Sequence, residues 1–251
     1  MENGPPGPAR WLEVAPGRLA GWLDSFAARH GGLAGPPQYS GSDDPGSGPA
    51  EGASVVVFRA ADGAIAECHP PFPPLPARAG GGVPGPEPAA SAALMAGHAL
   101  ADRTVGVLLV RLGGYAAGVF TGPGQQLAAS KVGSRLVHGR SAAGGQSQRR
   151  FARRREKQAS EALGAAADTA AAVFGPYNGR LDAVVLGGDK RAMSGLTDDP
   201  RLRPFLDLAV DRFLTVPDPR LAVLKGTPRS FTAIRIRLTE PASPDDPAAA
   251  S

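Results

Sequence analysis

The strongest constraint on the fold is an uninterrupted stretch between Gln146 and Phe174. The chain has 251 residues with 34 glycines and 26 prolines, yet this stretch contains no proline and a single glycine, Gly164. We therefore expect one helix roughly 40 Å long, ended by Gly175-Pro176. Apolar residues recur in it at i, i+3 and i+4 spacing: Ala159, Ala162, Leu163, Ala166, Ala170, Val173 and Phe174.

Apolar runs before this helix predict strands. Val105–Leu112, Tyr115–Thr121 and Gln125–Val132 are separated by short glycine-containing turns, which predicts an antiparallel meander. Earlier in the chain, two short apolar runs flank Asp62-Gly63. Asp-Gly between such runs is a strong hairpin signal.

Helix-like and strand-like segments alternate after the long helix. Ala183–Leu186, Arg212–Val216 and Phe231–Leu238 have strand patterns, and a helix is expected over Pro200–Asp211. A meander followed by alternating elements predicts an α/β fold with one mixed sheet and packed helices.

The domain organisation follows from composition. A helix over residues 15–30 is expected, whereas residues 1–10 are expected to be disordered and residues 34–53 and 69–90 to be mobile, because they are rich in Gly, Pro and Ser. We thus predict residues 1–53 as an N-terminal helix and flexible linker. The main domain would span residues 54–238, with 69–90 as a mobile insert, and residues 239–251 would be a disordered tail.

The ends and apolar content of the chain predict its compartment. The first residues lack a signal-peptide pattern, and no apolar stretch is long enough to span a membrane. The only cysteine, Cys68, ends an apolar run and is expected to be a buried thiol. We expect a cytoplasmic protein.

The segment that carries chemistry is Gly144-Gly145-Gln146, which lies in a strongly basic region. Glycines open backbone angles that other residues avoid. Like charges three and four residues apart on a helix repel, so the crowding predicts contact with a polyanion such as RNA; a solvated basic surface is the alternative. The candidate RNA-binding residues are Lys131, Arg135, Arg140, Arg149, Arg150, Arg153, Arg154, Arg155 and Lys157.

Gly144-Gly145-Gln146-Ser147, followed by Arg150-Phe151-Ala152-Arg153 and Arg155, resembles the catalytic loop and helix of eukaryotic and archaeal class I release factors. It is especially similar to the Vms-like release factors, in particular their actinobacterial branch with a complete GGQ. The resemblance covers about residues 54–238. It implies a ribonuclease-H-like mixed sheet, with the GGQ loop protruding and leading into the long helix.

The resemblance also implies a function. The expected activity is ribosome-dependent hydrolysis of peptidyl-tRNA, with Gly144, Gly145 and Gln146 as catalytic residues. Because no segment resembles a codon-reading domain, codon-independent rescue of stalled nascent chains is expected, on whole ribosomes or on large subunits. The expected partners are peptidyl-tRNA and ribosomal RNA of the large subunit, for a monomer without cofactor, metal or membrane contact. The alternatives are a nuclease that cuts the tRNA acceptor end and a non-catalytic RNA-binding factor.

Other chemistries are less well supported by the sequence. The four histidines, His30, His69, His98 and His138, lack metal-ligand spacing, and Ser130, Ser134, Ser141 and Ser147 have no evident histidine partner. Asp182 and Asp189 flank a strand, where a strand entry and a turn are favoured over a two-metal nuclease site. The segment Gly187–Arg191 could hold a phosphate, but an ordinary strand-to-helix turn is favoured.

Overall fold

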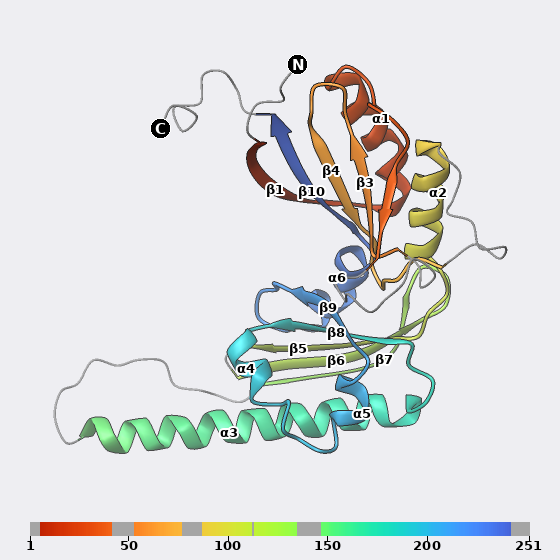
Figure 1. Ribbon diagram of the computed structural model, residues 1–251. Helices are drawn as coiled ribbons and strands as arrows, with labels where there is room; N and C mark the ends of the chain where they lie inside the picture. Colours follow the sequence, from red (N-terminus) through yellow and green to blue (C-terminus); the bar gives the residue numbers. More distant parts are fainter. Residues whose placement is uncertain (1–5, 42–52, 77–86, 112, 135–146, 242–251) are drawn as a thin grey trace. The chain divides into compact units, whose positions relative to one another are not determined.

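The computed structural model describes residues 6–41, 53–76, 87–111, 113–134 and 147–241 (Figure 1). The chain divides into two compact units. The first unit comprises Met1–Ala101 and Thr232–Ser251, and the second unit comprises Asp102–Phe231. Each contains its own five-stranded sheet, so the expectation of one sheet is wrong.

The sheet of the first unit is antiparallel throughout, with strand order β1-β10-β4-β3-β2. The last strand of the chain therefore lies between strands from its N-terminal part. The expected hairpin around Asp62-Gly63 is confirmed as β3 and β4. The strands are β1 Pro6–Val14, β2 Gln38–Ser40, β3 Val55–Arg59, β4 Ile65–His69 and β10 Ile234–Pro241.

Two helices, α1 (Leu19–Arg29) and α2 (Pro88–Ala99), pack on one face of this sheet (Figure 1). A short 3-10 helix, Pro16–Arg18, precedes α1. The expected helix over residues 15–30 is thus confirmed, because Leu19, Leu23 and Phe26 are buried at helical spacing. The free thiol of Cys68 is buried in the same core, as expected, and burial raises its pKa.

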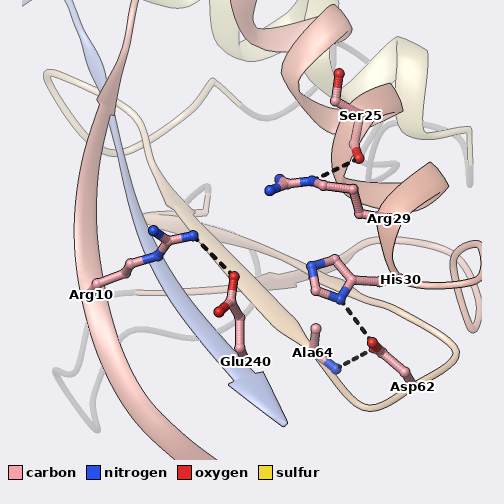
Figure 2. A network of polar contacts seen from close by, with 7 residues as sticks. All are labelled: Arg10, Ser25, Arg29, His30, Asp62, Ala64 and Glu240. Carbon is pink, nitrogen blue, oxygen red and sulfur yellow. Dashed lines mark hydrogen bonds and ion pairs between the residues drawn. The ribbon is translucent and has the colours of Figure 1, made fainter. Parts of the chain in front are cut away.

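A polar network ties the end of α1 to the β3–β4 turn (Figure 2). The ring of His30 packs on Phe26 with centroids 4.8 Å apart, and its Nδ1 lies 2.8 Å from Asp62 Oδ2. The other carboxylate oxygen of Asp62 accepts a hydrogen bond from the Ala64 N–H. This network fixes the hairpin against α1.

The second unit has a mixed sheet with strand order β7-β6-β5-β8-β9. The first three strands form the expected antiparallel meander, and β8 and β9 run parallel to β5. This arrangement agrees with the expected α/β class and ribonuclease-H-like sheet. The strands are β5 Val105–Arg111, β6 Gly114–Thr121, β7 Gln126–Ser134, β8 Ala183–Gly188 and β9 Ala209–Leu214.

Helices pack on both faces of this second sheet. One face carries α3, whose bounds Ser147–Phe174 confirm the expected long helix, and the short helices α4 (Lys190–Ser194) and α5 (Arg203–Leu206). A 3-10 helix, Gly175–Tyr177, follows α3. On the other face α6 (Leu221–Phe231) places the Phe231 ring 5.7 Å from that of Phe120.

Several expected boundaries differ from the structure. Residues 6–10 belong to β1, which pairs with β10, and β10 continues through Thr239 to Pro241 into the expected tail. Residues 38–40 form β2 within the expected linker. The helix expected over Pro200–Asp211 is wrong beyond α5, since β9 begins at Ala209.

The predicted division at residue 53 does not coincide with the compact units, because β3 and β4 pair into the sheet that also contains β1. The N-terminal residues therefore do contribute to a folded unit. Residues 42–52, 77–86 and 242–251 lie outside the described residues, and the mobility expected for 34–53 and 69–90 stays a prediction.

Candidate functional site

The site expected from the sequence lies between β7 and α3. Strand β7 ends at Ser134 and α3 begins at Ser147. Gly144, Gly145 and Gln146, together with Arg135 and Arg140, fall between these elements and lie outside the described residues. The geometry of the site is therefore that of the two elements on either side of the loop.

Among the side chains of α3 that the structure describes, those packed against the sheet lie in the C-terminal half of the helix. Ala162, Ala166, Ala167 and Ala170 are buried, and the helix continues toward its N-terminus past the sheet (Figure 1). Small alanine side chains let the helix lie close to β6. The first turns of α3 thus leave the body of the unit in the direction of the loop.

The basic residues of α3 belong to this projecting half. Arg149, Arg150, Arg153, Arg154 and Arg155 lie in the first turns of the helix; their side chains are outside what the structure describes. The Lys157 side chain is 79% exposed, and its Nζ lies 3.9 Å from Glu161 Oε1. Such an exposed pair contributes little to stability, so Lys157 remains accessible to another anion.

Lys131 lies on the same face of the sheet as α3. It is exposed on the edge strand β7 and pairs in register with Ala117 of β6. Ala117 is buried in the core that contains α3, and directly opposed residues of an antiparallel pair share a face. The structure thus places Lys131 and α3 on one side of the unit.

An ion-pair network holds the packed half of α3, and sequence reasoning missed it. Arg201 donates hydrogen bonds to Asp168 of α3 at 2.6 Å and to both carboxylate oxygens of Asp199, at 3.0 and 2.7 Å. The hydrogen bonds from Arg201 lower the pKa of Asp199 and, conversely, the carboxylates raise the pKa of Arg201. Phe174 also packs edge-on against Phe205, with centroids 5.4 Å apart. No local pattern predicts the contact between Arg201 and α3, because Arg201 and Asp168 are 33 positions apart in the sequence.

The carboxylates next to β8 hold the backbone. Asp182 Oδ2 accepts a hydrogen bond from the Thr104 N–H at 2.6 Å. Asp189 caps α4, with its Oδ1 accepting from the Arg191 and Ala192 N–H groups at 2.8 and 3.1 Å. The interpretation of Asp182 as a strand entry and of Asp189 as part of a turn is confirmed. Within the described ranges, no three His, Cys, Asp or Glu side chains gather into a potential metal site.

The Gly187–Arg191 segment is a strand-to-helix turn. Gly188 has a φ of +107°, and a Cβ there would overlap the Val110 carbonyl oxygen, so glycine is needed for strand packing. The Asp189 carboxylate already occupies the N-terminus of α4, where a phosphate would bind. Lys190 lies over the Phe213 ring, with its Nζ 5.7 Å from the centroid. The turn interpretation is therefore favoured over a phosphate site.

A comparison of the sequence with protein-family models identifies the family of this chain. The sequence model of the Actinobacteria/chloroflexi VLRF1 release factor family matches residues 103–237, more than half of the chain. The chain belongs to this family. Membership gives it a release-factor-like role in translation. The family match begins at residue 103. The resemblance described in the sequence analysis begins earlier, near residue 54.

Two solved structures are similar to this release-factor-family chain. One is an archaeal translation termination factor, aRF1, with 13% identity and a TM-score of 0.37; the alignment covers 92% of this chain and 68% of that chain. The other is an archaeal protein with 12% identity and a TM-score of 0.33, covering 89% and 64%. At these TM-scores the similarity gives no information about the fold, which is described by the sheet topology above. A comparison with curated proteins gives no match.

Two of the histidines considered above as possible metal ligands make structural contacts in the first unit. His98 Nε2 lies 2.8 Å from the Phe72 carbonyl oxygen, and His69 packs against Trp11. His138 lies outside the described residues. Among the helices of the described ranges, none is both long and apolar enough to cross a membrane.

Proposed function

We propose that this protein hydrolyses the ester of peptidyl-tRNA on the ribosome, with Gly144, Gly145 and Gln146 as its catalytic loop. Membership of a release-factor family implies interaction with ribosome and tRNA. The observation that carries the finer proposal is that a projecting, arginine-rich helix begins directly after Gly-Gly-Gln. The proposed substrate is a stalled nascent chain, released without reading a codon by a cytoplasmic monomer that needs no cofactor.

The shape of α3 suits delivery of a loop into a narrow centre. About 22 Å of helix, at 1.5 Å per residue, precedes Ala162, the first buried position among the side chains that the structure describes. The packed half, held by Arg201 and Phe205, fixes the direction of the projecting half. The proposed role of the arginines and of Lys131 is to bind RNA phosphates beside the loop.

The chemistry assigned to the loop needs no acid–base pair within this chain. Hydrolysis of the ester passes through a tetrahedral oxyanion. The neutral Gln146 side chain would orient water, while its backbone N–H would donate to the oxyanion, a contact typically worth about 100- to 1,000-fold in rate. Gly144 and Gly145 would allow the sharp turn that presents this N–H. The ribosomal RNA and the tRNA ribose hydroxyl would supply the remaining groups.

The decisive experiment measures release of labelled peptide from large subunits that carry peptidyl-tRNA. Gln146→Ala should abolish release while co-sedimentation with the subunits persists, because the arginines supply affinity and the loop supplies rate. Gln158→Ala is the matched control, since it makes the same change farther along α3. Gly145→Ala should also be severe, because a Cβ restricts the backbone that presents the Gln146 N–H. Full-rate release by both loop variants would exclude the proposed mechanism and leave a non-catalytic RNA-binding factor.

The state of the released tRNA distinguishes hydrolysis from nucleolytic cleavage. End-labelled tRNA should keep an intact 3′ terminus, because the proposed reaction breaks only the ester bond. A shortened tRNA would instead identify a nuclease that frees the peptide together with a piece of the acceptor end.

A further inference from the structure

The sheet of the first unit has one face that neither α1 nor α2 covers. Both α1 and α2 pack on the opposite face, against Val56, Cys68, Ile236 and their neighbours (Figure 1). We call the uncovered side the open face. The register defines it by three cross-strand rows: Glu13-Arg235-His69, Trp11-Arg237-Glu67-Val57-Gln38, and Ala9-Thr239-Ile65-Arg59.

Trp11 is the most conspicuous residue of the open face, because it is 50% exposed. The guanidinium carbon of Arg235 lies 4.4 Å from its ring centroid. The His69 ring lies 5.1 Å away and is tilted by 53°. The indole is therefore half-exposed, while Arg235 and His69 both pack against it. A tryptophan exposed in this way offers a large flat surface for stacking.

Two further arginines lie on the open face, Arg237 beside Trp11 in the same row and Arg59 on β3. Arg237 is 48% exposed and pairs with Glu67 at 3.0 Å, which neutralises that carboxylate. Arg59 is exposed, and its Nε lies 3.4 Å from Gln38 Oε1. Burial lowers the pKa of His69, so its ring is neutral near pH 7. Three arginines thus face two carboxylates, Glu67 and Glu13.

We propose that the open face binds single-stranded RNA, with a base stacked on Trp11 and with Arg59 and Arg237 contacting phosphates or base edges. Single-stranded RNA is bound in this way, by aromatic and guanidinium planes on a sheet with cationic groups around them. A protein partner would also use Trp and Arg. Protein interfaces, however, are depleted of charge at their centres, whereas every row of the open face carries a charged side chain.

The open face is formed by residues of the first unit, whereas residues 144–146 and α3 belong to the second unit, so separate substitutions test this proposal and the proposed catalysis. The two surfaces also differ in kind. Binding through α3 would depend on phosphates and therefore on salt. At the open face, the part of the affinity that comes from stacking of a base on Trp11 would vary little with salt.

Tryptophan fluorescence tests the proposal directly, because the chain has two tryptophans. Trp22 stacks on Phe26 on the covered side of the sheet, so Trp22→Phe leaves Trp11 as the sole reporter. Titration of this variant with a ten-nucleotide oligouridylate should quench Trp11 fluorescence to saturation. Unchanged fluorescence while the same RNA binds would overturn the proposal.

Affinity measurements provide the second test. Trp11→Ala should weaken oligouridylate binding about 5- to 100-fold, the range for loss of one stacked base, while Trp11→Phe should retain most of the affinity. The matched control is Leu100→Ala, which truncates another exposed apolar residue of the first unit, 54% exposed at the end of α2. The loss should be nearly constant across a salt series, whereas a triple replacement of Arg149, Arg153 and Arg154 should change the salt slope.

The outcomes separate this proposal from the proposed function. Gln146→Ala should keep full Trp11 quenching even when release is lost. If Trp11→Ala instead binds oligouridylate like the parent but loses ribosome binding, the open face contacts a protein and the RNA proposal is wrong.

Discussion

The two sheets of this protein have the same number of strands but bury their faces differently. The first-unit sheet is antiparallel with helices on one face, whereas the second-unit sheet is mixed with helices on both faces. The sequences of the strands reflect this difference. Ile234–Pro241 alternates buried and more exposed residues, whereas Val105–Arg111 is buried at six consecutive positions. A sheet covered on both sides needs a continuous apolar strand, and a sheet covered on one side needs alternation.

This difference separates a unit whose sheet is covered by helices on both faces from a unit whose own helices cover only one face. In the second unit helices cover both faces of the sheet, and the proposed function is assigned to α3 and to residues 144–146. In the first unit one face of the sheet is covered by neither α1 nor α2. Trp11 and Trp22, both in the first unit, give a fluorescence signal for that unit, while circular dichroism follows the whole chain. The two signals let each unit be tested by substitution.

The largest effect is expected for Gly188→Ala in the second unit. With a φ of +107° and the Val110 backbone where a Cβ would lie, the substitution should destabilise that unit by about 4 kcal/mol or more. Gly31→Ala in the first unit is the comparison. Its φ is +74°, but the nearest atom to a Cβ is 3.8 Å away, so only about 1–2 kcal/mol of backbone strain is expected. Urea unfolding followed by both signals measures this, and equal effects would contradict the packing argument.

A smaller effect is expected from truncation of the central strand. Leu108→Ala should cost about 2–5 kcal/mol, because Leu108 is 1% exposed within the α3 core and the space cannot collapse fully. Ile65→Ala on the open face should cost about 1 kcal/mol, because that side chain is half-buried. Thermal or urea unfolding provides the comparison. An Ile65→Ala cost as large as that of Leu108→Ala would mean that another element covers the open face.

The two units also differ in how they use arginine. Arg212 is 9% exposed, and its Nη1 donates to the Ser230 and Phe231 carbonyl oxygens at the end of α6, at 2.7 and 3.0 Å. Arg212→Ala should therefore cost about 2–3 kcal/mol, since buried carbonyls lose a charged donor. Arg237→Ala on the open face should cost under about 1 kcal/mol, because its ion pair is solvated. Similar costs in urea unfolding would show that Arg212 is not a capping group.

The smallest effect concerns acid stability in the first unit. Burial raises the pKa of Asp62, but hydrogen bonds from the Ala64 N–H and His30, and the charge of His30, outweigh burial and lower it below 3.8. A carboxyl with a lowered pKa adds stability above its unfolded pKa and loses it as pH falls through the folded pKa. Asp62→Asn should flatten the loss of tryptophan-monitored stability below about pH 4. Asp199→Asn, whose change lies in the second unit, is the control and should leave the tryptophan-monitored profile unchanged.

Local patterns were sufficient for much of the second unit. The meander was predictable because glycine turns bound apolar runs, and α3 was predictable because its apolar spacing continues without a breaker. Helix α6 escaped detection because Gly226 and Pro228 interrupt it; buried Leu224 and Phe231 offset their unfavourable propensities. The same reasoning failed for β1, since its glycine and prolines suggested disorder while its pairing with β10 decides its conformation.

Sequence alone determined the long helix, the hairpin, the meander, the resemblance to release factors and the basic segment after Gly144-Gly145-Gln146. It could do so because helix periodicity, turn chemistry and charge crowding act between residues close in the chain. Only the tertiary structure decided that there are two sheets, that the C-terminal half of α3 packs against the second sheet, and that the Arg235 guanidinium lies over the Trp11 ring. These depend on pairings such as β1 with β10, between residues more than 200 positions apart. Local propensity contains no information about such contacts, since burial and strand pairing outweigh it.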